Sequence, residues 1–258
     1  MDWVVPPGVA PVPVVACLPH DGTEFPAELC AGLAVDPSLL WSDWLTRDLY
    51  DFLPELGITT VTTRFSRFVA DVNRDPAGQR FGPLRTSVVA ERLSDGRPVY
   101  HTPPGTAELQ RRIDLVHRPY HHALDAVIAA HLRTAPRVLV LDLHSFGAPV
   151  DADVVLGDRR GATAAPEITG ALRQAFTGNG FAVRVNERYA GGWTVRRFAG
   201  YPRVDAVQIE LNKRCYLDYP ARLTRDLPPP PRNNFYEVKA RLRAAVAAMC
   251  AGEQDIAV

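Results

Sequence analysis

The segment Arg137-Val-Leu-Val-Leu-Asp-Leu143 is an almost continuous apolar run, and it predicts the most clearly buried strand of the chain. The strand should deliver His144 and Ser145 into the loop that follows it. Because alternate side chains share one face of a strand, Asp142 would lie on the same face as His144. A carboxylate in that place could orient the imidazole by a hydrogen bond.

A second buried strand is predicted near the N-terminus. Val12-Pro-Val-Val-Ala-Cys-Leu18 is short, apolar and rich in β-branched residues, and it ends abruptly at a turn over residues 19–22. His20 therefore follows one predicted strand directly, as His144 follows another. A parallel sheet could bring these two histidines together despite their separation in sequence.

Helices and strands alternate along the rest of the chain. Strands are predicted over residues 58–63, 153–156, 181–185 and 206–211, and helices over residues 37–53, 106–132, 166–176 and 235–250. This alternation indicates an α/β fold with a mostly parallel, mixed sheet and helices on both faces. We expect one domain over residues 1–258, with its core at about 12–220 and its site outside the carboxyl ends of the strands.

The predicted helix over residues 37–53 rests on the spacing of its leucines and aromatic residues. Ser38 is its candidate N-cap, which would place Asp43 in an early part of the helix. Gly57 would end the segment.

The predicted helix over residues 106–132 should be capped by Thr106 and kinked at Pro119. Before it, residues 71–104 are rich in Arg, Asp, Gly and Pro and have no sustained period. This composition predicts a long irregular excursion. Long loops in compact domains usually carry function.

The composition is that of an ordinary globular protein. The chain has 258 residues, of which 47% are hydrophobic and 22% are charged. Lys plus Arg and Asp plus Glu number 29 each, so no excess of charge favours nucleic acid or an anionic membrane as the partner. We expect a small-molecule partner, and the sequence does not indicate an oligomeric state.

Two further patterns bear on the cellular compartment and on cysteine chemistry. The N-terminal residues 1–20 contain an early acidic residue and several prolines, which disfavours a signal peptide, and no apolar run is long enough to span a bilayer. A cytoplasmic protein is therefore expected. The four cysteines are scattered without a CxxC pair, which argues against a disulfide framework and a thiolate zinc site.

The histidines at the predicted strand ends are candidate metal ligands. Hydrolysis of an unactivated amide needs an activated water and a charge that stabilises the oxyanion, and a divalent metal supplies both. Such a site has three protein ligands and an open position. Beside His20 and His144, Asp43 and Glu24 both qualify by type as the third ligand. A surface or core role is expected for His117, His121 and His122, which lie in a helical stretch.

Glu210 is a candidate catalytic base. It stands between Ile209 and Leu211 in an apolar predicted strand, where a carboxylate is costly to bury unless it is paired or used. The alternative is a carboxylate on the polar face of an edge strand.

Arginines suggest a substrate that carries a carboxylate, because guanidinium groups bind carboxylates bidentately. Two of the arginines, Arg196 and Arg197, follow Gly191 and Gly192, where a close backbone approach is possible. The candidates around the irregular excursion and after the glycine pair are Arg64, Arg67, Arg74, Arg80, Arg196 and Arg197.

Seven blocks, taken in order, resemble the N-formylglutamate amidohydrolase family over about residues 12–220. They are Leu18-Pro-His-Asp-Gly-Thr23, Ser42-Asp-Trp44, Ser66-Arg-Phe-Val-Ala-Asp-Val-Asn-Arg74, Arg118-Pro-Tyr-His121, Leu141-Asp-Leu-His-Ser145, Tyr189-Ala-Gly-Gly192 and Val207-Gln-Ile-Glu-Leu211. The resemblance implies a zinc-type metallohydrolase that releases formate from N-formyl-L-glutamate. It also implies an architecture similar to zinc carboxypeptidases and aspartoacylases.

Carried over by position, the resemblance implies His20, Asp43 and His144 as ligands of one divalent metal, with Glu24 in reserve. Zinc suits two histidines and a carboxylate, although nickel, cobalt and iron accept them too. Glu210 is implied as the general base. The residues implied to bind the substrate, chiefly its carboxylate, are Arg67, Asn73, Arg74 and Arg196.

Two positions differ from the pattern expected of the family. Trp193 follows the glycine pair where His or Tyr is expected, and Asp21 replaces a small residue in the first block. Both changes are expected to reshape the pocket, which makes N-formylglutamate one candidate among several N-acyl amino acids. The alternatives are a carboxypeptidase-like or polyglutamate-hydrolase-like enzyme with the same metal site and a non-catalytic binding module on the same fold.

Overall fold

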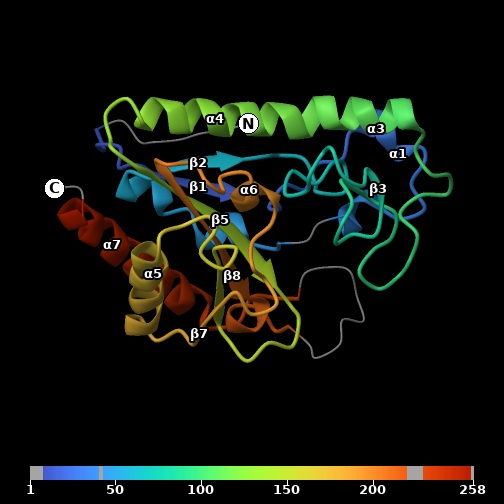
Figure 1. The fold of residues 1–258 in the computed structure, drawn as a ribbon. Helices are drawn as coiled ribbons and strands as arrows, with labels where there is room; N and C mark the ends of the chain where they lie inside the picture. The colour runs from blue at the N-terminus through green and yellow to red at the C-terminus, as the bar shows by residue number, and fades with distance from the viewer. Residues whose placement is uncertain (1–7, 41–42, 220–228, 257–258) are drawn as a thin grey trace.

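The computed structural model describes residues 8–40, 43–219 and 229–256, and a six-stranded sheet lies at its centre (Figure 1). The strand order is β2-β1-β5-β8-β6-β7. The first four strands are parallel, β6 is antiparallel to β8, and β7 is parallel to β6. The strands are β1 (Val14–Leu18), β2 (Thr59–Thr62), β5 (Val138–Phe146), β6 (Val154–Gly157), β7 (Val183–Val185) and β8 (Val204–Asn212). The predicted mixed α/β sheet is confirmed.

The central strands β5 and β8 are longer than predicted, and every residue in them is buried. Their pairing continues to Phe146 and Asn212, so His144 and Ser145 lie in the strand and not in a following loop. The prediction that the strand ends at Leu143 is therefore wrong. Because β8 lies between β5 and β6, the edge-strand interpretation of Glu210 is also wrong.

Helices cover both faces of the sheet. Figure 1 shows α3 (Thr106–Arg112), the π-helical turn η3 (Ile113–His117) and α4 (Arg118–His131) as one rod on one side, with α5 (Pro166–Gly178) and α7 (Phe235–Ile256) on the other. None of the helices in the described part of the chain has the length and apolar character needed to cross a bilayer.

Alternation along β5 divides the core between the two faces. Val138 and Val140 pack in the cluster that contains the buried face of α4, whereas Leu139, Leu141 and Leu143 pack in the cluster that contains α5 and α7. The α4 face becomes polar toward the carboxyl end of the strand, because the next side chains on it belong to Asp142 and His144.

The rod on the α4 side accommodates Pro119 through the π-helical turn η3, which immediately precedes α4. Proline lacks an N–H and clashes with the carbonyl four residues earlier, and a π turn relaxes this local geometry. Thr106 is the first helical residue and Gly105 takes the N-cap position, so the predicted Thr106 cap is wrong by one residue.

The predicted continuous helix over residues 37–53 is wrong. The segment contains η1 (Pro37–Leu39) and α2 (Thr46–Leu49), with η2 (Leu53–Leu56) after it, and Leu45 has a left-handed backbone with φ 59°. The side chain of Asp36, not Ser38, caps η1. Leucines at helical spacing are nevertheless buried. The helical periodicity of the leucines therefore reflects side chains of a folded loop that pack in the core.

The remaining short elements lie mostly in loops. They are α1 (Ala27–Cys30), β3 (Phe81–Gly82), β4 (Val89–Ala90), α6 (Trp193–Arg196) and η4 (Lys213–Cys215). Within residues 71–104 the only strands are the two-residue β3 and β4, so the predicted irregular excursion is confirmed.

Replacing Leu172 with alanine should lower the free energy of unfolding by about 2–5 kcal/mol, because a buried leucine leaves a cavity when truncated. Leu172 is 1% exposed on α5, whereas Leu115 in η3 is 40% exposed and serves as a matched control. Leu115→Ala should change stability by no more than about 0.5 kcal/mol. Urea denaturation followed by circular dichroism measures both, and equal losses would contradict the assignment of the core.

Candidate metal centre

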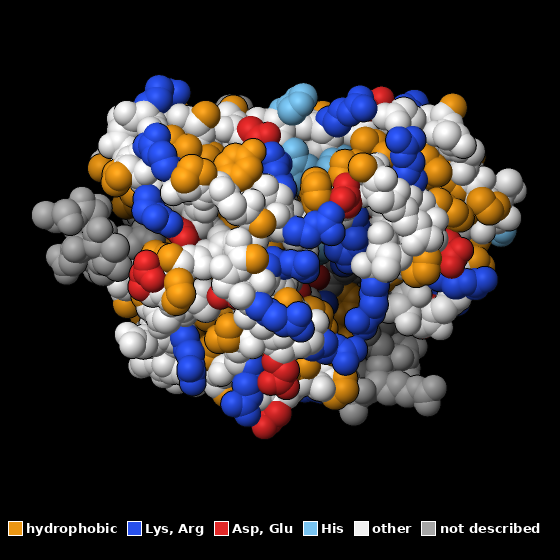
Figure 2. Space-filling view, in the orientation of Figure 1, with side chains coloured by type: hydrophobic (Ala, Val, Ile, Leu, Met, Phe, Trp, Pro, Cys, Tyr) orange, Lys and Arg blue, Asp and Glu red, His pale blue; other side chains and the backbone are white. Residues whose placement is uncertain are grey.

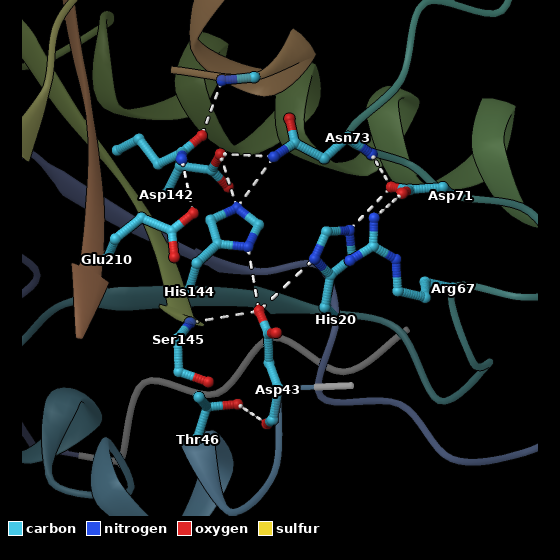
Figure 3. A network of polar contacts seen from close by, with 12 residues as sticks. His20, Asp43, Thr46, Arg67, Asp71, Asn73, Asp142, His144, Ser145 and Glu210 are labelled. Carbon is cyan, nitrogen blue, oxygen red and sulfur yellow. Dashed lines mark hydrogen bonds and ion pairs between the residues drawn. The ribbon is translucent and has the colours of Figure 1, made fainter. Parts of the chain in front are cut away.

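Three side chains from separate parts of the chain converge on one point (Figure 3). His20 lies in the turn after β1, Asp43 in the loop before α2, and His144 near the end of β5. All three are buried, and their candidate ligand atoms lie within 4.8 Å of one another. The Asp43 Oδ2 atom is 3.1 Å from Nδ1 of His144 and 3.5 Å from Nδ1 of His20.

A second carboxylate meets the far side of each imidazole ring. Nε2 of His20 is 2.7 Å from Oδ1 of Asp71, and Nε2 of His144 is 3.0 Å from Oδ2 of Asp142. A carboxylate at Nε2 favours the proton there and leaves the Nδ1 lone pair for a metal. Two imidazole nitrogens and a carboxylate oxygen form a donor set that fits a divalent ion such as zinc. The orienting role predicted for Asp142 is consistent with this contact.

The charges at the centre stabilise one another. Burial disfavours ionised Asp43, but hydrogen bonds from His144 and His20 hold the pKa of the carboxyl well below its ordinary value. Burial also disfavours protonated His144, yet the charge of Asp142 and the hydrogen bonds of Asp142 and Asp43 hold the pKa of the imidazole well above its ordinary value. Metal binding at Nδ1 would therefore displace a proton from His144.

Glu210 lies beside His144 on the same face of the sheet, because the two residues are direct partners in the β5–β8 register. Its carboxylate accepts a hydrogen bond of 2.9 Å from Nε2 of Gln208. Burial raises the pKa of Glu210 to about 7, an effect that nearby His144 partly opposes. A carboxyl group with such a pKa can accept and return a proton near neutral pH.

Lys213 adds a buried positive charge that the sequence interpretation missed. Its Nζ lies 3.9 Å from Oδ1 of Asp43 and donates a hydrogen bond of 3.3 Å to the carbonyl oxygen of Ser145. The ammonium group also lies over the ring of Trp44, 5.1 Å from its centroid. It follows β8 directly, a position that could have identified it.

These groups line a cavity of about 670 Å³, a volume typical of small-molecule sites. Figure 2 shows Lys and Arg side chains gathered around a hollow on this face of the molecule. Arg67 and Arg74 line the cavity and share Asp71: Arg67 donates a hydrogen bond to its carboxylate, and Nε of Arg74 lies 3.7 Å from it. Two of the three arginines expected near the substrate, Arg67 and Arg74, are thus brought to the cavity.

Asn73 lines the cavity but is also committed to the metal centre. Its Nδ2 lies 2.9 Å from Nε2 of His144 and donates to Asp142 over 3.3 Å, while its Oδ1 accepts from the backbone N–H of Thr194. A Cβ on Gly192 would come within 2.4 Å of this amide. A close approach was expected at the glycine pair, and the group that approaches Gly192 is the side-chain amide of Asn73.

Two expected site residues lie elsewhere. Glu24 is exposed and pairs with Arg64 over 3.4 Å, so the structure does not bring the reserve ligand to the metal centre. Arg196 is not among the residues that line the cavity, because its guanidinium pairs with Asp75 over 2.6 Å and lies over the ring of Trp193. The structure therefore does not bring Arg196 into the cavity lining with Arg67 and Arg74.

The positions that differ from the family pattern also lie outside the cavity lining. Asp21 accepts a hydrogen bond from Arg47 over 2.8 Å, and Trp193 packs beneath Arg196. Neither side chain contributes to the wall of the pocket, so the expected direct reshaping of the pocket is not seen.

The helical histidines behave as expected. His117 and His121 are buried, and their Nε2 atoms lie 2.8 Å from the backbone carbonyl oxygens of Arg74 and Val72. His122 is exposed on α4. The two buried histidines therefore hold the backbone of the segment that carries Asn73.

Known proteins share both the sequence pattern and the fold. The sequence profile of the family described as N-formylglutamate amidohydrolase matches residues 12–217. N-formylglutamate deformylase from Pseudomonas aeruginosa is 32% identical over 222 residues, covering 80% of this chain and 83% of the relative. The deformylase of the same name from Pseudomonas putida is 27% identical over 231 residues, covering 84% and 86%. A crystal structure of N-formylglutamate amidohydrolase from Ralstonia eutropha JMP134 superposes with a TM-score of 0.79 at 26% identity, covering 98% of this chain and 97% of that one.

Replacing either His20 or His144 with alanine should abolish tight binding of a divalent metal, because each removes one of three protein ligands. The unaltered protein should carry about one equivalent after purification, measured by elemental analysis. His122→Ala, an exposed histidine on α4, is the matched control and should retain the metal. Full metal content in both His20→Ala and His144→Ala would refute the proposed ligand set.

Proposed function

The chain belongs to the N-formylglutamate amidohydrolase family and is a hydrolase, and we propose that it releases formate from the N-formyl group of an acidic amino acid such as N-formylglutamate with the aid of a bound divalent metal. The observation that carries the proposal is the convergence of His20, Asp43 and His144 with Glu210 in one arginine-lined cavity. The similarity to relatives named N-formylglutamate deformylase supports the choice of substrate.

The proposed cofactor is one zinc ion held by His20, Asp43 and His144. When bound, such an ion polarises an amide carbonyl and lowers the pKa of a water molecule. The protein contributes the geometry, because Asp71 and Asp142 restrain both imidazole rings from the side away from Asp43.

Glu210 is the proposed general base and acid. Its carboxylate takes a proton from the water that attacks the formyl carbon, and the carboxylic acid returns a proton to the nitrogen as the carbon–nitrogen bond breaks. The products are formate and the free amine. The hydrogen bond from Gln208 leaves Oε2 of Glu210 for this transfer, since Gln208 donates to Oε1.

Arg67 and Arg74 are proposed to bind a carboxylate of the substrate close to the scissile bond. Both side chains line the cavity beside the metal centre, and each guanidinium contacts Asp71. A guanidinium carries five N–H donors in a planar fork, so the donors that Asp71 does not use are the ones proposed to bind the substrate carboxylate. Asn73 is proposed to act with them from the same segment, chiefly by positioning Asp142, which in turn orients His144.

Glu210→Gln should lower kcat on the order of a hundredfold or more and leave the metal content unchanged, because it removes the proton acceptor but keeps the shape of the side chain. Formate release from N-formylglutamate measures turnover. Glu167→Gln, an exposed glutamate in α5, is the matched control and should keep full activity. Near-normal turnover of metal-loaded Glu210→Gln would remove this residue from the mechanism.

Arg74→Ala should raise KM for N-formylglutamate about tenfold or more with a smaller effect on kcat, as expected when a charge-assisted contact to the substrate is lost from ground state and transition state alike. Arg80→Ala is the matched control, since Arg80 is exposed in the same excursion and is not part of the cavity lining. Steady-state kinetics separate the two parameters, and an unchanged KM in Arg74→Ala would exclude the carboxylate contact.

A further inference from the structure

Three more arginines line the cavity beyond those that contact Asp71. They are Arg85, Arg159 and Arg188, and all three are exposed. Across the described ranges, none of the three has a carboxylate within ion-pair distance. This side of the cavity therefore presents positive charge that no carboxylate of the described residues neutralises, in line with the Lys and Arg side chains around the hollow in Figure 2.

The backbone holds two of these arginines in an unfavourable conformation. Arg159 has φ 56° and Arg188 has φ 63°, in the left-handed region that residues with a Cβ rarely adopt. Asn186 fixes both loops: its Oδ1 accepts from the backbone N–H groups of Asp158 and Arg160, and its Nδ2 donates to Oδ1 of Asp158 over 2.7 Å. Strained backbone that the surroundings enforce clusters at ligand sites.

Neighbouring groups also direct the side chain of Arg159. A guanidinium nitrogen of Arg159 donates to the carbonyl oxygen of Gly191 over 3.3 Å, and a Cβ on Gly191 would come within 3.3 Å of Cδ of Arg159. Arg188 is followed by Tyr189, whose ring lies against Phe146 at the cavity wall. The guanidinium of Arg159 is thus restrained before any ligand binds, whereas Arg188 is restrained through its backbone.

We propose that Arg159 and Arg188, with Arg85, form a second anion subsite that binds the side-chain carboxylate of an N-acyl amino diacid. The proposal rests on the proposed function, since it names a part of the same substrate. The inner arginines Arg67 and Arg74 already share Asp71, so a second carboxylate needs a second group of cations. Arginine suits this role because its planar fork binds a carboxylate bidentately.

The test compares N-formyl-L-glutamate with N-formyl-L-glutamine, which differ only at the side-chain terminus, where a neutral amide replaces the carboxylate. The ratio of their kcat/KM values should favour the glutamate derivative in the unaltered, metal-loaded enzyme. The double variant Arg159→Gln/Arg188→Gln should reduce this ratio about tenfold or more, as loss of charge-assisted hydrogen bonds predicts. Adding Arg85→Gln should reduce it further.

Arg160→Gln is the matched control. Arg160 is exposed, has φ 59° and lies in the same loop, but it is not part of the cavity lining. Arg160→Gln removes the same charge from the same region, so this variant reports any effect of the overall electrostatic field. The ratio of the two kcat/KM values should stay unchanged in it. The preference of the unaltered enzyme for the glutamate derivative over the glutamine derivative should also fall as salt is added, because exposed charges are screened over about 10 Å at 0.1 M ionic strength.

A binding measurement separates this proposal from the proposed function. Calorimetry on metal-loaded Glu210→Gln gives the Kd of both compounds without turnover. One outcome would support the subsite and reject the proposed reaction. In that case the unaltered enzyme releases no formate, but it binds the diacid preferentially, and the arginine replacements abolish this preference. An unchanged preference in the double variant, an equal loss in Arg160→Gln, or no preference for the diacid in either assay overturns the subsite.

Discussion

The pairing of β5 with β8 is the constraint on which the site depends. Nine consecutive residues of each strand face one another, and the register sets His144 beside Glu210 and Asp142 beside Gln208. One strand thus carries a metal ligand and its orienting carboxylate, while the other carries the proposed base and the amide that holds it. A shift of β8 by one residue would turn Gln208 and Glu210 to the face opposite Asp142 and His144. The buried apolar residues between them, which pack against α5 and α7, prevent such a shift.

The cost of this arrangement is a dense group of buried charges. Isolated charges are strongly disfavoured in a protein interior, but here the ionised groups are paired: Asp71 with His20 and Arg67, and Asp142 with His144. The charges of Arg67 and Arg74 outweigh the effect of burial and hold the pKa of Asp71 well below its ordinary value. Removing one partner would leave a buried charge unpaired. The chemistry of the centre and its contribution to stability are therefore coupled.

The sequence predicted the parts of this site that depend on local patterns. Apolar runs identified the strands before His20 and His144, and the alternation rule placed Asp142 beside His144. The helix predicted over residues 37–53 failed, because leucines at helical spacing also fill a core from an irregular loop. Asp71 and three of the cavity arginines, Arg85, Arg159 and Arg188, were not recognised as site residues, since their positions depend on contacts between segments far apart in sequence. Arg196 was assigned to the substrate by its type and by the family resemblance, neither of which shows that its guanidinium pairs with Asp75 outside the cavity lining.

The hydrogen bonds between Asn186 and Asp158 bear on how the substrate range of such a protein can change in evolution. The groups assigned to bond cleavage belong to β5, β8, the turn after β1 and the buried loop position Asp43, whereas the exposed Arg159 and Arg188 belong to loops that follow β6 and β7. Loops tolerate substitution better than buried strands do. Mutations in these two loops could therefore alter which acyl amino acid is accepted while the hydrolytic machinery stays intact, so that new substrates become accessible in evolution without rebuilding the enzyme.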